Sequence, residues 1–144
     1  MGDGIALPKQ SAKYCYHLSA REGRSQSIGR LKMKKILFSS DRFFQVWKYT
    51  VSHKCLLIWS TRSDEIATRI EILFWGVNRM ELPTTFHGLK ILEVSNVDET
   101  LVSGHFLYEI QQNNQPVGRI VARDISIKEN SGWHHDASEF DFFG

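Results

Sequence analysis

Residues 43–61 read FFQVWKYTVSHKCLLIWST and contain two strand-like runs joined by a short polar link. In the first run, residues 43–51, apolar and polar side chains alternate with period two, as in a strand with one buried face. The second run, residues 55–61, is apolar on both faces, which predicts a central or covered strand. The link, residues 52–54, is short enough to favour an antiparallel hairpin over a crossover.

Within the first run the sequence divides the apolar side chains between two faces. Phe44 and Val46 lie on one face, and we predict that the other face is the core face. The predicted core-facing residues are Phe43, Trp47, Tyr49 and Val51.

Strand signals continue along the chain. Residues 68–75 alternate in their first half, so we expect Ile70, Ile72 and Phe74 to point inward and Arg69 and Glu71 to lie in water. A glycine at position 76 breaks the alternation and predicts a bulge or bend. A proline at position 83 ends the strand because it has no N–H for a ladder.

The remaining residues predict further short strands and turns. Residues 84–88 are expected to form a loop, 89–94 a strand and 95–99 a turn. The residues from Asn113 to Pro116 are the strongest turn signal, and a return strand follows over about 117–128. No segment predicts a convincing helix or a parallel βαβ unit. We therefore expect an all-β fold: a single antiparallel, meander-type sheet of about six or seven strands, curled into a small sandwich or partly open barrel.

Net charge and residue composition divide the 144 residues into three parts. Residues 1–32 have a net charge of 6 − 2 = +4 and no useful apolar pattern, so we expect a weakly ordered basic leader or an upstream extension. Residues 33–37, MKKIL, look like a bacterial start. We expect an all-β domain over 33–132 and a His-containing, acidic-aromatic tail over 133–144. Residues 33–144 have a net charge of 12 − 14 = −2, so the domain is not expected to bind nucleic acid.

The cysteines and the apolar runs bear on the compartment. Cys15 lies in the leader and Cys55 in a hydrophobic run, so no structural disulfide is expected and a reducing, cytoplasmic location is favoured. Cys55 is interpreted as a small buried hydrophobe rather than a nucleophile. No run reaches the length of a membrane-spanning helix, and no membrane partner is expected.

Three groups of residues are candidates for a site. His134 and Asp136 would share one face of an extended strand and could hold a metal ion, against the plainer interpretation of a solvated tail. His87, in the predicted loop, could line the polar mouth of a barrel with His105 and Glu109. Phe140, Phe142 and Phe143 either dock on the domain, which we favour, or form an exposed motif for a protein partner.

The sequence alone does not establish a function. It contains no nucleophile elbow, phosphate-binding glycine loop or HExxH motif, which favours a non-enzymatic protein without a cofactor. The first hypothesis is a bacterial interaction module that binds another protein through a sheet face or edge. An immunity protein that neutralises a basic nuclease toxin is one concrete version, because the domain is acidic. The second hypothesis is a β-barrel that binds or transforms a small ligand near His87 and His105.

Overall fold

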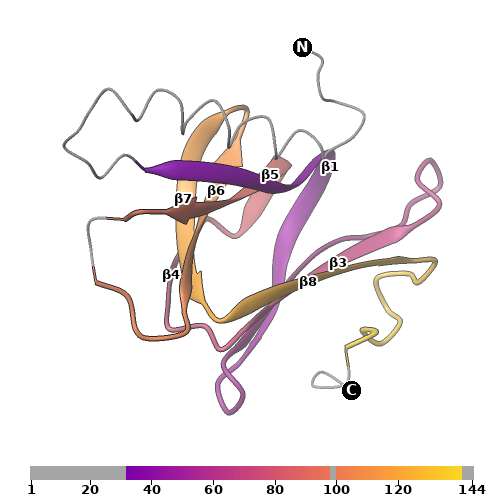
Figure 1. Ribbon diagram of the computed structural model, residues 1–144. Helices are drawn as coiled ribbons and strands as arrows, with labels where there is room; N and C mark the ends of the chain where they lie inside the picture. The colour runs from indigo at the N-terminus through magenta and orange to yellow at the C-terminus, as the bar shows by residue number, and fades with distance from the viewer. Residues whose placement is uncertain (1–31, 98–99, 141–144) are drawn as a thin grey trace.

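The computed structural model describes residues 32–97 and 100–140, and these residues form one antiparallel sheet of eight strands (Figure 1). The strands are β1 (Met33–Thr50), β2 (Cys55–Ser60), β3 (Arg69–Trp75), β4 (Arg79–Glu81), β5 (Thr85–Ser95), β6 (Phe106–Gln112), β7 (Gln115–Ala122) and β8 (Asp124–Asn130). Their order in the sheet is β4-β7-β6-β5-β1-β2-β3-β8. The described residues contain no helix, so none that could cross a membrane.

The long strand β1 joins the two halves of the sheet. It pairs with β5 from Met33 to Gln45 and with β2 from Gln45 to Thr50. The pairing with β5 shifts register between Ser40 and Phe43, and such a bulge increases the local bend and twist of a strand. As a result β1 can belong to both halves while the sheet turns back on itself.

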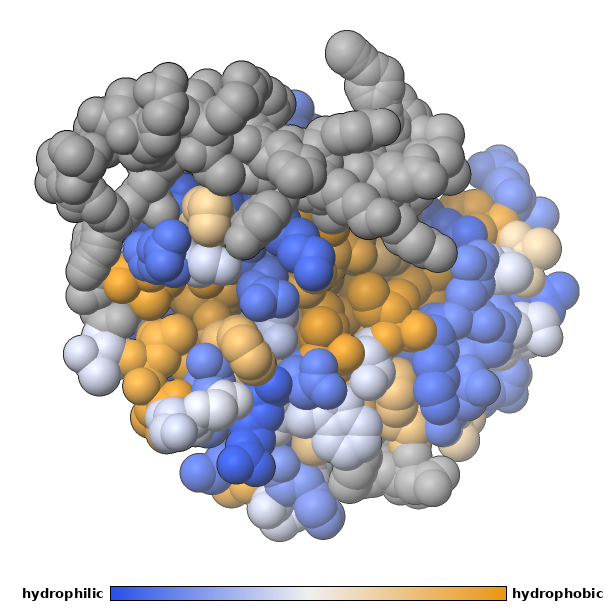
Figure 2. Space-filling model, viewed as in Figure 1, coloured by the Kyte–Doolittle hydropathy of each residue, from blue (hydrophilic) through white to orange (hydrophobic). Residues whose placement is uncertain are grey.

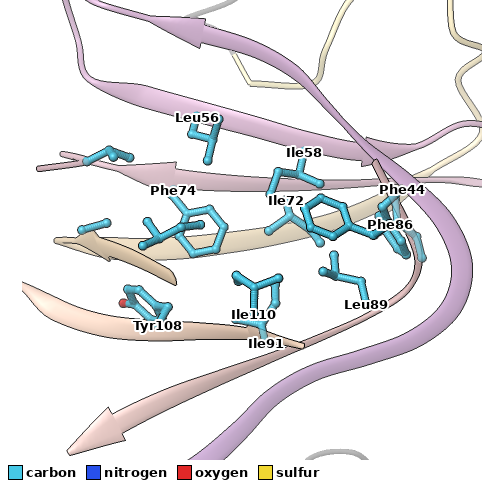
Figure 3. Packing of buried hydrophobic residues seen from close by; sticks show 14 residues of the cluster. Phe44, Leu56, Ile58, Ile72, Phe74, Phe86, Leu89, Ile91, Tyr108 and Ile110 are labelled. Carbon is cyan, nitrogen blue, oxygen red and sulfur yellow. The ribbon is translucent and has the colours of Figure 1, made fainter. Parts of the chain in front are cut away.

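The inner faces of the two halves share one hydrophobic core (Figure 3). Phe74 of β3 packs edge-on against Tyr108 of β6, with ring centroids 5.4 Å apart, although β2, β1 and β5 separate these strands in the sheet. A flat sheet could not bring them into contact. Figure 3 shows side chains of β2 and β3 facing those of β5 and β6 across the interior: Leu56, Ile58, Ile72 and Phe74 on one side, and Leu89, Ile91, Tyr108 and Ile110 on the other.

The all-β antiparallel class predicted from the sequence is confirmed, but the described residues form eight strands rather than six or seven, and their sheet is not closed into a barrel. The expected return strand over 117–128 is two strands, divided at Arg123. β7 pairs with β6 and β4, whereas β8 pairs with β3. The order therefore departs from a simple meander, because the chain crosses from one half of the sheet to the other after Ala122.

Two predicted turns are confirmed by their backbone angles. Gly76 has a φ of +59°, and a Cβ there would lie 2.7 Å from Cδ of Arg123, so the bend after β3 requires glycine. Asn113 and Asn114 have φ values of +55° and +61°, which fits the two-residue turn joining β6 to β7. The prediction for β2 also holds, because every residue of that strand is buried between β1 and β3.

The predicted core face of β1 is wrong. Phe44 is completely buried and Val46 packs against the core, whereas the four residues predicted to face inward are exposed. Their exposed fractions are 45% for Phe43, 44% for Trp47, 36% for Tyr49 and 76% for Val51. Both sets are apolar, so the alternation could not choose between them. The pairing of Phe44 with Phe86 decides the inward face, because residues directly opposite on antiparallel strands share a face.

The loop predicted over 84–88 is also wrong, because β5 begins at Thr85. His87 pairs with Phe43 inside the sheet. Gly88, which suggested a loop, has a φ of +91° and lies opposite the register shift of β1. Its positive φ thus accommodates a bulge between paired strands.

Hydrophobic side chains gather over the middle of the face shown in Figure 2. Hydrophilic residues cover its right-hand border, where Figure 1 places the connection between β2 and β3.

Of the predicted leader, only Lys32 is among the described residues.

Candidate functional site

A buried ion pair lies on the outer face of β3. Arg69 Nη2 and Glu71 Oε2 are 2.9 Å apart, and the side chains are 3% and 0% exposed. The sequence predicted both residues in water, and that prediction is wrong. Taking two charges out of water costs several kcal/mol unless hydrogen bonds satisfy them.

Arg69 binds the backbone of the segment that follows β8. Its Nη1 donates to the carbonyl oxygens of Trp133 at 2.8 Å and Asp136 at 3.0 Å, and its Nη2 donates to that of Ala137 at 2.9 Å. Its Nε donates to Oδ1 of Asn130 at 3.2 Å. With Glu71, every N–H of the guanidinium has an acceptor. Three of these acceptors are main-chain carbonyls, so the contact depends on the path of the segment more than on its side chains.

Glu71 completes the attachment with hydrogen bonds that it accepts. Ser138 Oγ donates to Oε1, and the backbone N–H of Glu139 reaches both carboxylate oxygens at 3.2 Å. Asn130 Nδ2 donates to Oε2 at 2.8 Å. Charge-assisted hydrogen bonds of this kind are about twice as strong as neutral ones. We call residues 131–140 the C-terminal segment and the surface that holds it the outer groove.

Apolar and cation–π contacts form the wall of the outer groove. Phe140 is 5% exposed and packs in a cluster with residues of β2 and β3: Cys55, Leu57, Trp59 and Leu73. The Arg69 guanidinium lies over the Trp59 ring at 4.7 Å, and Lys128 Nζ lies over the Phe140 ring at 4.7 Å. Beyond Trp59, the ring of Trp47 lies 4.4 Å away. The wall is thus continuous from the segment to the exposed side of β1.

A tight turn shapes the start of the segment. The Trp133 N–H donates to Asp136 Oδ2 at 2.8 Å, and the Asp136 N–H donates to the Trp133 carbonyl at 3.0 Å. The first of these bonds is the main reason why the pKa of the Asp136 carboxyl is held below its ordinary value, with smaller contributions from His135, Arg69 and Arg62. The turn presents two carbonyls to Arg69 at once.

The predicted metal ligands lie in this turn and not on an extended strand. Asp136 caps the turn, and the exposed His134 ring stands at 89° to that of His135. Among residues 32–97 and 100–140, no three His, Cys, Asp or Glu side chains are grouped closely enough to hold a metal ion. The assumed strand geometry is therefore wrong, and metal binding stays a prediction.

The predicted ligand-binding residues are not brought together. His87 stacks on Phe43 at one end of the β5–β6 pair, and His105 lies in the turn before β6 at the other. Glu109 forms an ion pair with Lys34 at 3.1 Å on the rim of an open depression of 340 Å³. Neither histidine lines this depression.

The described residues include part of the aromatic tail and one of the two cysteines. Phe140 is docked, as the sequence favoured, whereas Phe142 and Phe143 lie outside the described residues. Cys15 also lies outside them. Cys55 is a free, buried thiol whose pKa is raised by burial, so it stays protonated and makes a poor nucleophile.

The sequence analysis missed Arg69 and Glu71, although one signal pointed to them. The neighbouring run over 55–61 is apolar on both faces, so something had to cover its outer face. Whatever covers one strand of a sheet also reaches the strand beside it. The outer residues of β3 were therefore candidates for burial.

The comparisons with known proteins yield no relative: no family model, curated protein or solved structure matches this chain.

Proposed function

We propose that this protein is a non-enzymatic interaction module that binds a peptide segment of a partner protein in the outer groove. One observation carries the proposal: the groove already holds a peptide segment, its own residues 131–140, through a buried ion pair whose hydrogen bonds point at that segment. A sheet face that only needed sealing could be covered by apolar side chains at a lower desolvation cost.

The contacts define the partner chemistry. Arg69 would bind carbonyls of a turn in any sequence, and Glu71 would select a hydroxyl followed by a free N–H. The pocket filled by Phe140 would select an aromatic side chain two residues after the hydroxyl. The expected ligand is thus a turn followed by Ser or Thr, any residue, and an aromatic residue.

The C-terminal segment competes with such a ligand. A short tether gives it an effective concentration of about 1 mM, so a partner must bind tightly or must meet a weakened segment. A change that weakens the attachment should therefore increase the apparent affinity for a peptide supplied in trans.

An immunity protein of a bacterial cytoplasm remains one concrete version of this function. Its support is the net charge of −2 over residues 33–144, which suits a basic toxin. The alternative, a ligand-binding barrel with a polar mouth, is less well supported. The interior between the two halves of the sheet is filled by side chains, and His87 and His105 lie at opposite ends of the β5–β6 pair.

The test uses the full chain with Phe140→Ala and a synthetic peptide of residues 131–140, SGWHHDASEF. Calorimetry should show binding to this variant and at least tenfold weaker apparent binding to the unaltered chain, because the intact segment occupies the groove. Faster proteolysis at Trp133 in the variant would show that its segment has been released. If release is incomplete, Ser138→Ala combined with Phe140→Ala removes a second attachment.

Two controls separate specific recognition from nonspecific binding. A peptide whose last residue is alanine should bind much less, because the aromatic pocket stays empty. The chain variant Phe106→Ala changes a half-exposed phenylalanine outside the groove and should behave like the unaltered chain. A released segment with no binding of the peptide in trans would overturn the proposal and leave the groove as a structural seal.

A further inference from the structure

The β1–β2 hairpin ends in an exposed apolar tip. We call residues 47–54 the hairpin tip; its turn is the loop that projects at the bottom of Figure 1. Val51 is 76% exposed, more than any other large hydrophobic residue in the described part of the chain, and Trp47 and Tyr49 are 44% and 36% exposed. The next residues of β2, from Cys55 onward, are buried, so the tip stands on a rigid base.

The two aromatic residues lie on opposite faces of the hairpin. Trp47 stacks on Trp59, whose side chain belongs to the outer groove. Tyr49 pairs with Leu56, whose side chain lies in the inner core, so Tyr49 lies on the inner side of the sheet. The register shift between Val46 and Lys48 separates it from the side of Trp47, and its position beyond the core leaves it exposed. The tip therefore has an aliphatic residue at its end and an amphipathic ring on each side. A stacking platform for nucleic-acid bases would instead gather its aromatics on one face.

Between Asp41 and Asp64 the charged side chains are all basic. From Arg42 to Arg62 the chain has four basic residues and no Asp or Glu, although residues 33–144 as a whole are acidic. Lys48 and Lys54 lie within the tip, and both are exposed. Of the carboxylates on the strands beyond β2, Glu71 of β3 is buried in the outer groove, and the exposed Asp124 lies opposite Trp75 at the start of β8, with β3 between it and the hairpin.

We propose that the hairpin tip binds the surface of an anionic lipid bilayer. Val51 enters the boundary between headgroups and acyl chains, Trp47 and Tyr49 lie at headgroup level, and the lysines contact anionic headgroups. This departs from the expectation of no membrane partner, which rested on the lack of a spanning run. A surface contact needs no such run. It also does not rest on the outer groove.

Cosedimentation of the full chain with vesicles tests the proposal. The vesicles contain equal parts phosphatidylcholine and phosphatidylserine, and pure phosphatidylcholine vesicles are the neutral comparison. We expect binding to the anionic vesicles alone, weakened by salt. Lys48→Ala and Lys54→Ala should each reduce the partition coefficient about fivefold, the effect of one cation near such a surface.

Matched variants locate the contact. Val51→Asp should abolish vesicle binding. If the aspartate disturbs folding, Val51→Ser is the alternative variant and should weaken binding. Val102→Asp changes a residue that is 52% exposed in the connection between β5 and β6 and should leave binding unchanged. Phe106→Ala, at a half-exposed position outside both the hairpin tip and the outer groove, should also leave it unchanged. Equal sedimentation with both vesicle types, or binding only to a single-stranded oligonucleotide, would overturn the proposal.

Discussion

The two faces of β3 are buried by different means. On the inner face, Ile72 and Phe74 contact strands from the opposite half of the sheet through apolar side chains alone. On the outer face, Arg69 and Glu71 contact a segment that has no strand pairing. The inner face can be exposed only if the sheet opens. The outer face can be exposed if the ten residues of the C-terminal segment detach from the sheet. One strand can thus serve both a cooperative core and a locally opening site.

The largest effect should come from the inner face. Phe74→Ala removes a fully buried ring that packs on Tyr108, so we expect the free energy of unfolding to fall by about 3–5 kcal/mol. Denaturant unfolding measures this fall in the free energy of unfolding. Phe106→Ala, at a half-exposed position of β6, should cost less than about 1 kcal/mol. Equal losses for the two variants would mean that the shared core does not hold the halves together.

The ion pair should give a smaller and more local effect. Arg69→Met leaves the Glu71 carboxylate buried without its partner, which costs about 3 kcal/mol at most, because undocking of the segment lets water reach the charge. The variant should therefore show rapid proteolysis after Asn130 while the sheet stays folded. Arg69→Met with Glu71→Leu should recover most of the loss, since no buried charge remains. A global loss of fold in the single variant would contradict local opening.

The smallest effect should be the pH dependence of the turn at the start of the segment. The folded-state pKa of Asp136 lies below its ordinary value, so the ionised form stabilises the turn. This stabilisation is complete above the unfolded-state pKa and is lost as the pH falls through the folded-state pKa. The amide resonance of Trp133 should report that titration, and it should be absent in Asp136→Asn. A midpoint above the ordinary range for aspartate would refute the assigned hydrogen bond.

Local patterns predicted the elements better than they predicted the faces. The turn at Asn113 and Asn114 and the bend at Gly76 were predictable because backbone conformation there depends on one or two residues. The inward face of β1 was not predictable, since Phe43 and Phe44 are equally apolar and only the partner strands distinguish them. Of the candidate site, the docked Phe140 was expected, but Arg69 and Glu71 were not. A charged residue is buried only when distant groups satisfy it, and the sequence does not show which groups those are.

The sequence by itself determined an all-β antiparallel fold, because period-two alternation, apolar strands and turn residues act over short distances along the chain. It also determined that β2 would be covered on both sides. Only the tertiary structure decided that β7 and β8 separate at Arg123, that the sheet folds onto itself, and that the C-terminal segment covers β3. These features depend on contacts between residues more than 30 positions apart, such as Phe74 with Tyr108 and Arg69 with Trp133. The free energy of such contacts comes from pairs of surfaces that meet only when the chain is folded.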